Sequence, residues 1–154
     1  MNVQEQQAHV DADQFVIFRL DEESYGVSIH YVEIIEKVTP ITRVPNSEEY
    51  VLGVINLRGE IVPVIDLRNL FDLPSSTITD ESRIIILTVQ EVTVGILADS
   101  SSEVLTIHKA QIENTGTVLS IVDEGSVEGI GKVDDRMIIL LDIHSILGFE
   151  KSES

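Results

Sequence analysis

The chain has 154 residues, a formal charge of −17 at pH 7 and no cysteine, which excludes disulfides, thiol catalysis and cysteine-ligated metal sites. The tails 1–14 and 149–154 carry −3 and −1 of this charge, so residues 15–148 carry −13. Such acidity disfavours nucleic-acid binding and adhesion to anionic membranes, because both would repel it. Hydrophobic residues make up 43% and aromatics only 5%, so the interior is rich in Val, Ile and Leu, which favours strands.

The polar, acidic segment 1–14 predicts a disordered N-terminal tail, and 149–154 predicts a C-terminal tail. Segment 1–14 has neither the basic nor the apolar region of a secretory signal, and no apolar run approaches the ~20 residues of a membrane span. We therefore expect a cytoplasmic protein without direct membrane insertion.

Short apolar runs separated by turn residues recur along the chain and predict a mainly β fold. Predicted strands cover 15–20, 25–29, 41–44, 54–57, 61–65, 83–89, 92–98, 103–107, 127–133 and 137–141. The run 29–36 fits either a helical turn or a continued strand, 46–49 predicts a short helical turn, and 110–123 is less regular. Short helices are predicted at 67–71 and 143–147, each after an aspartate suited to cap it.

The two halves of the chain resemble each other. GVINLRGEIVPVIDLRNLF at 53–71 aligns without gaps with GIGKVDDRMIILLDIHSIL at 129–147, at an offset of 76, and 15–26 aligns with 84–95 at an offset of 69. This pattern predicts two similar barrels of about five strands each, at about 15–79 and 80–148, because closure removes exposed sheet edges. A single β-sandwich is the alternative.

Asp66 and Asp142 occupy equivalent places, as the two carboxylates of a duplicated acid hydrolase would. Large residues follow both, Leu-Arg after Asp66 and Ile-His after Asp142, whereas a catalytic dyad needs small neighbours. Helix capping explains both without chemistry, and it is the interpretation that we favour. The four histidines show no metal-ligand spacing, and no nucleotide-binding or nucleophile motif is present, so we expect no catalytic, cofactor-binding or metal-binding residues.

The stretch N-L-R-G at 56–59 places Arg58 at a predicted hairpin tip, with Gly59 supplying a positive φ. A long cation there can bond a carboxylate of this chain or of a partner, although an ordinary solvated turn residue is the simpler interpretation.

At these residues the chain resembles the CheW family of chemotaxis coupling proteins. The resemblance rests on GVINLRGEIVPVIDLR at 53–68, ITRVP at 41–45, EVL at 103–105 and DRMIILLD at 135–142, and it spans 15–148. It implies a CheW-like domain of two five-stranded Src-homology-3-like β-barrels. It also implies a non-enzymatic adaptor that binds the regulatory domain of the histidine kinase CheA and the cytoplasmic tip of methyl-accepting chemotaxis receptors, within receptor arrays at the membrane.

The resemblance also assigns contact residues. Receptor contacts fall on Val32, Asn56, Leu57, Arg58, Gly95 and Val104, and kinase contacts on Val44, Pro45 and Gly53. Core packing is the alternative role for Val32 and Val104.

One departure concerns a glutamate that pairs with the N-L-R-G arginine in many members. Here Glu33 lies one place early, and a one-residue shift in a strand reverses the face. We therefore expect Arg58 to pair elsewhere or to stay free for a partner. The alternative to a stand-alone adaptor is a CheW-like module of a CheA or CheV protein, which the polar end at Ser154 disfavours.

Overall fold

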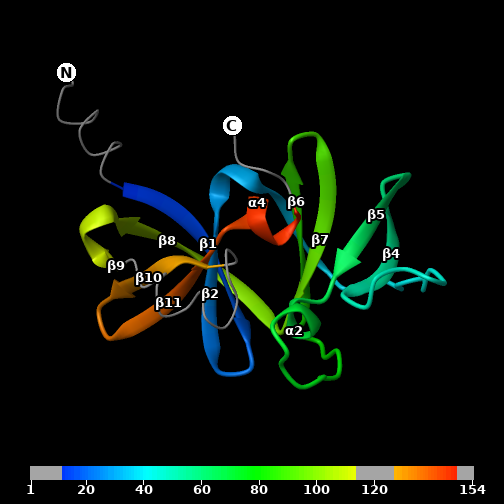
Figure 1. The fold of residues 1–154 in the computed structure, drawn as a ribbon, viewed down its shortest axis with the longest axis horizontal. Helices are drawn as coiled ribbons and strands as arrows, with labels where there is room; N and C mark the ends of the chain where they lie inside the picture. Colours follow the sequence, from blue (N-terminus) through cyan, green and yellow to red (C-terminus); the bar gives the residue numbers. More distant parts are fainter. Residues whose placement is uncertain (1–11, 114–126, 149–154) are drawn as a thin grey trace. The chain divides into compact units, whose positions relative to one another are not determined.

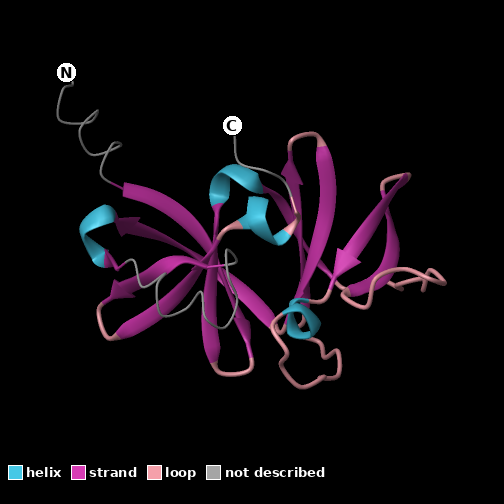
Figure 2. Cartoon of the chain, viewed as in Figure 1, coloured by secondary structure: helices cyan, strands magenta, loops and turns pink. Residues whose placement is uncertain are grey.

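The computed structural model describes residues 12–113 and 127–148, which form two compact units (Figure 1). Unit 1 contains the described parts of three segments, 12–18, 22–30 and 102–113 with 127–148. Unit 2 contains 19–21 and 31–101. Strands dominate the described residues, and each helix among them is a single turn (Figure 2), as the β-rich composition predicts.

A six-stranded sheet with the order β8-β1-β2-β11-β10-β9 forms the framework of unit 1. Its strands are β1 (Ala12–Leu20), β2 (Glu23–Ser28), β8 (Ser100–His108), β9 (Ile112–Glu113), β10 (Val127–Val133) and β11 (Arg136–Leu141). The core beneath it gathers Phe15 and Ile17 of β1, Ile107 of β8 and Ile138 and Leu140 of β11. These positions are two apart within a strand, so one face of each strand is apolar and buried.

A five-stranded sheet with the order β3-β6-β7-β5-β4 forms the framework of unit 2. Its strands are β3 (Val32–Lys37), β4 (Val51–Leu57), β5 (Glu60–Ile65), β6 (Arg83–Val89) and β7 (Val92–Ala98). Its core gathers Ile55, Val62, Val64, Ile84 and Ile86. Each fully buried side chain of this size stabilises the fold by about 1.5–3 kcal/mol relative to an exposed one.

Short helices punctuate the strands. They are the 3-10 turns η1 (Ile29–Tyr31) and η2 (Lys109–Gln111) and the α-helical turns α2 (Leu67–Leu70) and α4 (Ile143–Ile146). Among the described residues no helix is long and apolar enough to cross a membrane.

The strand registers confirm the internal repeat. Val51 pairs with Ile65 and Val127 with Leu141, 76 residues later, and both hairpins carry a register shift immediately afterwards. A parallel pair lies inside each sheet in the same way, since Val64 lies opposite Gly95 and Leu140 lies opposite Gly26. The first member of that pair follows the offset of 76 and the second the offset of 69.

The two units do not divide the chain near residues 79 and 80, as predicted for two consecutive barrels. The β1–β2 hairpin pairs with β11 from the second half of the chain, and β7 pairs with β5 from the first half. Each unit therefore combines strands from both halves. The sequence offset identifies equivalent strands, but it does not show which sheet each copy of a strand joins. Because strands from one half join the sheet of the other half, the boundary between the two units differs from the predicted one.

Local differences concern loops. The predicted strand 41–44 is reduced to a bridge between Thr42 and Val54, and 46–49 is irregular rather than helical. The ambiguous run 29–36 is both structures in turn, η1 followed by β3. The first strand, β1, begins at Ala12, which lies inside the predicted N-terminal tail. Residues 1–11, 149–154 and most of 110–123 lie outside the described residues.

Candidate functional site

The β4–β5 hairpin has a two-residue loop, because Leu57 pairs with Glu60. Its loop residues have positive φ, 54° at Arg58 and 89° at Gly59, which matches the twist of the flanking strands. The side chain of Asn56 turns back and accepts a hydrogen bond from the Gly59 amide at 2.9 Å. The hydrogen bond from Gly59 to Asn56 therefore fixes the loop, and the side chain of Arg58 points outward from it.

Arg58 is an unexpected residue for this place. A non-glycine residue with positive φ costs about 1–2 kcal/mol, and Asn, Asp or Gly normally occupies such loops. Its side chain is 72% exposed, and Nη2 lies 3.8 Å from Oε2 of Glu36 on β3. A single long contact at such exposure contributes little stability and leaves most guanidinium donors facing solvent. The contact between Arg58 and Glu36 therefore does little to hold the fold.

Arg58 pairs with Glu36 and not with Glu33, in agreement with the expectation that Glu33 lies on the wrong face of its strand. Exposure alternates along β3, and Glu33 instead accepts a hydrogen bond from the Thr88 hydroxyl. Glu36 has the opposite parity to Glu33, so it lies on the face that Glu33 cannot reach. The alternation of faces along β3 could have identified Glu36 as a residue on the face opposite to Glu33. The strand pairing of β3 was needed to show that this face lies near Arg58.

The other predicted receptor residues serve different roles. Val32 is half-buried and pairs with Leu87, and Gly95 is buried where a Cβ atom would lie 2.8 Å from Ile84 Cγ2. Gly95 therefore permits close packing. Val104 is exposed on β8, a strand whose residues from 102 onward belong to unit 1. The structure brings Asn56, Leu57 and Arg58 together on one hairpin and places Val32 and Gly95 in the same unit.

The predicted kinase residues separate into two kinds. Val44 and Pro45 are exposed and line a depression of about 690 Å³ in unit 2. Gly53 is buried, and a Cβ atom there would lie 2.2 Å from the carbonyl oxygen of Thr42. The absence of a side chain at Gly53 lets this segment bond to Thr42, so its role in the fold is structural.

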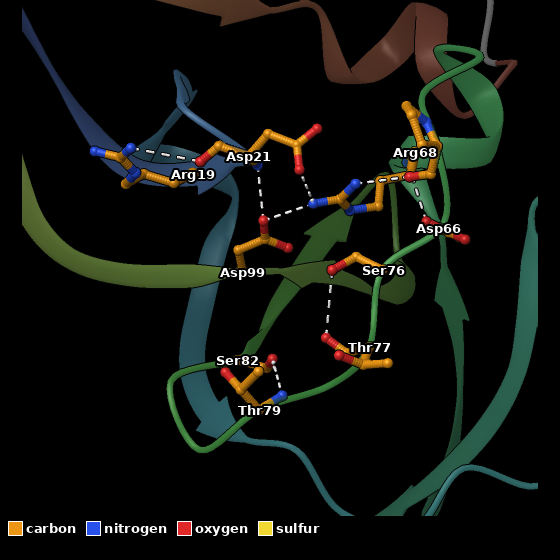
Figure 3. A network of polar contacts seen from close by, with 10 residues as sticks. Arg19, Asp21, Asp66, Arg68, Ser76, Thr77, Thr79, Ser82 and Asp99 are labelled. Carbon is orange, nitrogen blue, oxygen red and sulfur yellow. Dashed lines mark hydrogen bonds and ion pairs between the residues drawn. The ribbon is translucent and has the colours of Figure 1, made fainter.

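A charge cluster around Arg68 was not anticipated from the sequence. Its side chain is only 7% exposed, and Nη2 lies 2.7 Å from Asp21 Oδ1 and 2.6 Å from Asp99 Oδ2 (Figure 3). Nη1 donates to the carbonyl oxygen of Pro74 at 2.7 Å, and the Asp21 amide donates to Asp99 Oδ2 at 2.7 Å. Burial lowers the pKa of Arg68, but the hydrogen bonds to Asp21 and then Asp99 outweigh it and raise the pKa above the ordinary value.

The members of this Arg68 cluster come from three distant segments, all within unit 2. Asp21 forms the β1–β2 turn, Asp99 follows β7, and Arg68 lies in α2. Arg68 alone carries a signal in the sequence, because a basic residue inside an apolar helical turn needs a buried partner. The identity of the partners depends on the tertiary fold.

Asp66 and Asp142 cap their helices, as predicted. Asp66 Oδ1 accepts the Arg68 amide at 3.0 Å, and Asp142 Oδ1 accepts the Ser145 amide at 3.2 Å. The two aspartates belong to different units, each engaged at the start of its own helix. Within the residues described, no group of three His, Asp or Glu side chains is arranged to hold a metal ion.

Comparison with known proteins gives this arrangement a family. Two β units, one with an exposed arginine on a hairpin tip, define a β-rich module. The chain belongs to the CheW-like domain family, whose model matches residues 14–151. This membership assigns the chain a role as a chemotaxis adaptor, or scaffold.

Individual relatives agree along most of their length. The chain is 38% identical to a chemotaxis protein CheW of Bacillus subtilis, over 92% of this chain and 91% of the relative. It is 35% identical to a chemotaxis protein CheW of Klebsiella aerogenes, over 90% and 83% respectively. The crystal structure of a scaffolding protein, TtCheW of Thermoanaerobacter tengcongensis, superposes with a TM-score of 0.81 at 37% identity, covering 92% of this chain and 97% of that chain.

Proposed function

We propose that this protein couples methyl-accepting chemoreceptors to the histidine kinase CheA, and that it acts by binding alone. Family membership supports the adaptor role. The observation that carries the proposal is Arg58, which occupies a positive-φ loop position at a conformational cost and projects into solvent with one long contact. Strained backbone positions of this kind cluster at binding and active sites.

The receptor surface is centred on the β4–β5 hairpin, with Asn56 fixing the loop and Leu57 and Arg58 available to a partner. A helical receptor tip would be recognised by apolar contacts along one face and by a polar group that fixes register. Arg58 supplies that polar group, because its fork of donors can bind a carboxylate. Val32 is a further apolar candidate in unit 2, where Gly95 contributes through packing, and Val104 is a separate apolar candidate in unit 1.

The kinase surface lies at the loop that contains Val44 and Pro45. Both residues are exposed next to a depression, whereas Gly53 lets the backbone approach closely enough for Val54 to exchange hydrogen bonds with Thr42. An apolar side chain beside a proline gives a partner a preformed contact with little entropy to lose. In this proposal the protein works on the cytoplasmic side of receptor arrays, without a cofactor, and its acidic surface keeps it off nucleic acid and anionic lipid.

Binding to separate partners tests this proposal. The full chain is titrated with a CheA regulatory domain and, separately, with a receptor fragment that contains the signalling tip. We expect saturable binding to both and a ternary mixture in which each partner leaves the other's binding intact. Binding to neither partner would overturn the proposal.

A further inference from the structure

An ion pair in unit 1 joins two strands that are not neighbours in its sheet. Arg136, at the start of β11, donates to Glu103 on β8, with Nη2 2.7 Å from Oε2 and Nη1 3.2 Å from Oε1. The strands β1 and β2 lie between β8 and β11 in the sheet order. The sheet therefore curls far enough for its first strand to reach the β10–β11 hairpin, and a two-point contact of opposite charges holds them together.

The ion pair lies at the end of two rows of core side chains. Glu103 shares a face of β8 with Leu105 and Ile107, because residues two apart in a strand point the same way. Arg136 shares a face of β11 with Ile138 in the same manner. Ile107 and Ile138 belong to the core of unit 1, and Leu105 packs against it. The pair is therefore the polar margin of the contact between these strands, where both side chains are about two-fifths exposed.

The strand β8 depends on side-chain contacts along one of its sides. It is the end strand of the sheet order, with β1 as its neighbour, so its backbone pairs with a strand on one side. A second ion pair of unit 1, Lys132 with Glu113 at 2.8 Å, joins β10 to the neighbouring β9 and does not reach β8. The contact between Arg136 and Glu103 is thus the ion pair of these two that fixes β8.

This contact bears on Val104, which lies between Glu103 and Leu105 in the chain. Val104 has the opposite parity, so its side chain points away from the core, and it is 46% exposed. Both of its neighbours are held against the hairpin or the core, so the direction of the Val104 side chain is set before any partner arrives. Setting a contact residue in advance reduces the entropy that binding must overcome.

The equivalent place in unit 2 has a looser contact. There β3 is the first strand of its sheet order, and Glu36 on β3 meets Arg58 of the β4–β5 hairpin through a single contact of 3.8 Å. In unit 1 the hydrogen bonds with Glu103 raise the pKa of Arg136 above its ordinary value. Arg136 is therefore engaged in closing its own sheet, whereas most of the Arg58 donors face solvent.

We propose that Arg136 and Glu103 are positioning residues for the receptor contact at Val104. By holding β8 against the β10–β11 hairpin, the pair keeps Val104 in the direction from which the receptor meets it, and neither charged side chain touches the receptor. This inference rests on the proposed function, which assigns Val104 to the receptor surface, and it adds two residues that act through Val104.

A double-mutant cycle in the full chain tests the inference. The variants Glu103→Gln, Arg136→Gln and the double variant are titrated with the receptor tip fragment. We expect each single substitution to weaken affinity about two- to fivefold, because the pair is partly exposed. The double variant should lose no more than either single one, because all three lack the same contact. The matched control, Lys132→Gln, removes the pair with Glu113 in the same unit and should leave receptor affinity unchanged.

The methyl groups of Val104 give a readout that a purely stabilising ion pair would not change. We expect their nuclear magnetic resonance order parameters to fall in Glu103→Gln and to stay unchanged in Lys132→Gln, since only the first substitution frees β8. All variants should bind the CheA regulatory domain as the unsubstituted chain does, which shows that they are folded.

The outcomes separate this inference from the proposed function. If the unsubstituted chain does not bind the receptor fragment, the proposed function fails. If it binds but the single variants bind equally well, or if the Val104 methyl groups stay as ordered in Glu103→Gln, only this inference is overturned. Losses that add in the double variant would also overturn it, because the two side chains would then contact the receptor independently.

Discussion

The segments 53–71 and 129–147 are two copies of one structural motif. Their backbones have the same conformation at positions where their side chains differ. Both form a hairpin with the same pairing register and end in an aspartate-capped helical turn. The hairpin tips carry Arg58 in one copy and Asp134 in the other, and both residues have positive φ, 54° and 57°. The helices carry Arg68 in one copy and His144 in the other.

The features that the two copies share build the fold, and the side chains that differ between them distinguish the two hairpins and helices. The shared register is set by alternating apolar residues and two-residue loops, which both copies keep. The cation at the tip and the buried cation in the helix occur only in the copy at 53–71. The surfaces proposed for receptor and kinase also lie mainly in unit 2, which contains that copy. The departures between the copies are a buried cation that joins three segments of unit 2 and an exposed cation at the hairpin tip, where the receptor contact is proposed.

The largest expected effect is the loss of Arg68. Arg68→Ala leaves Asp21 and Asp99 close together without their cation, and we expect a loss of about 2–4 kcal/mol in the free energy of unfolding. The value lies toward the lower end for buried pairs because Asp21 remains half exposed. Chemical denaturation measures it. The double variant Arg68→Met with Asp99→Asn should recover part of the loss, and a loss below that of a helix cap would contradict the role of the cluster.

The paired glycines sharpen the comparison. A Cβ atom at Gly53 would lie 2.2 Å from a backbone oxygen of Thr42, whereas at Gly129 the nearest atom is the Glu113 oxygen at 2.9 Å. We expect Gly53→Ala to destabilise by about 3 kcal/mol and Gly129→Ala by about 1 kcal/mol, because overpacking against rigid backbone cannot be relieved. Thermal unfolding of both variants checks the order. Equal losses would mean that the two copies are equally tight at this bulge.

The helix caps are expected to be equivalent. Asp66→Ala and Asp142→Ala should each cost about 0.5–2 kcal/mol, because each removes an acceptor for one helical amide. The substitutions Asp66→Asn and Asp142→Asn should retain most of the stability, since Asn caps nearly as well. Denaturant midpoints provide the measurement, and large losses in the Asn variants would argue against simple capping.

The smallest effect concerns an ion pair of unit 1. Arg136 donates to Glu103 at 2.7 and 3.2 Å, and this hydrogen bonding lowers the pKa of Glu103. A carboxyl pKa that is lower in the folded state adds stability above its unfolded value, and that stability is lost as pH falls through the folded value. Because both side chains are about two-fifths exposed, the pair should contribute about 0.2–1 kcal/mol at neutral pH. Glu103→Gln should show this loss at pH 7, and the difference from the unsubstituted chain should shrink as the pH falls below the ordinary glutamate pKa of about 4.3.

The sequence was sufficient where local chemistry decides the structure. The repeat offset, the N-L-R-G hairpin and the two aspartate caps were predicted, because turn residues and apolar alternation act within a few residues. The division into units was wrong, since strand exchange between halves depends on long-range pairing. The Arg68 cluster was missed for the same reason, because Asp21 and Asp99 lie 47 and 31 residues from Arg68 along the chain.

The site was predicted unevenly. The hairpin residues 56–58 lie together on one loop, but Gly95 and Gly53 are buried packing positions. Glycines that matter to function and glycines that allow close backbone approach look alike in a sequence, and only the neighbours distinguish them. The assignment of receptor and kinase contacts stays a prediction.

The most direct measurement is receptor affinity of the two hairpin-tip variants, Arg58→Ala and Asp134→Ala. Titration with the receptor tip fragment should show about tenfold or weaker binding for Arg58→Ala, because a charge-assisted contact is lost, and unchanged binding for Asp134→Ala. Both variants should unfold within about 1 kcal/mol of the unsubstituted chain. Unchanged receptor binding in Arg58→Ala, or equal losses in both variants, would contradict the claim that the tip at 56–59 is the recognition copy.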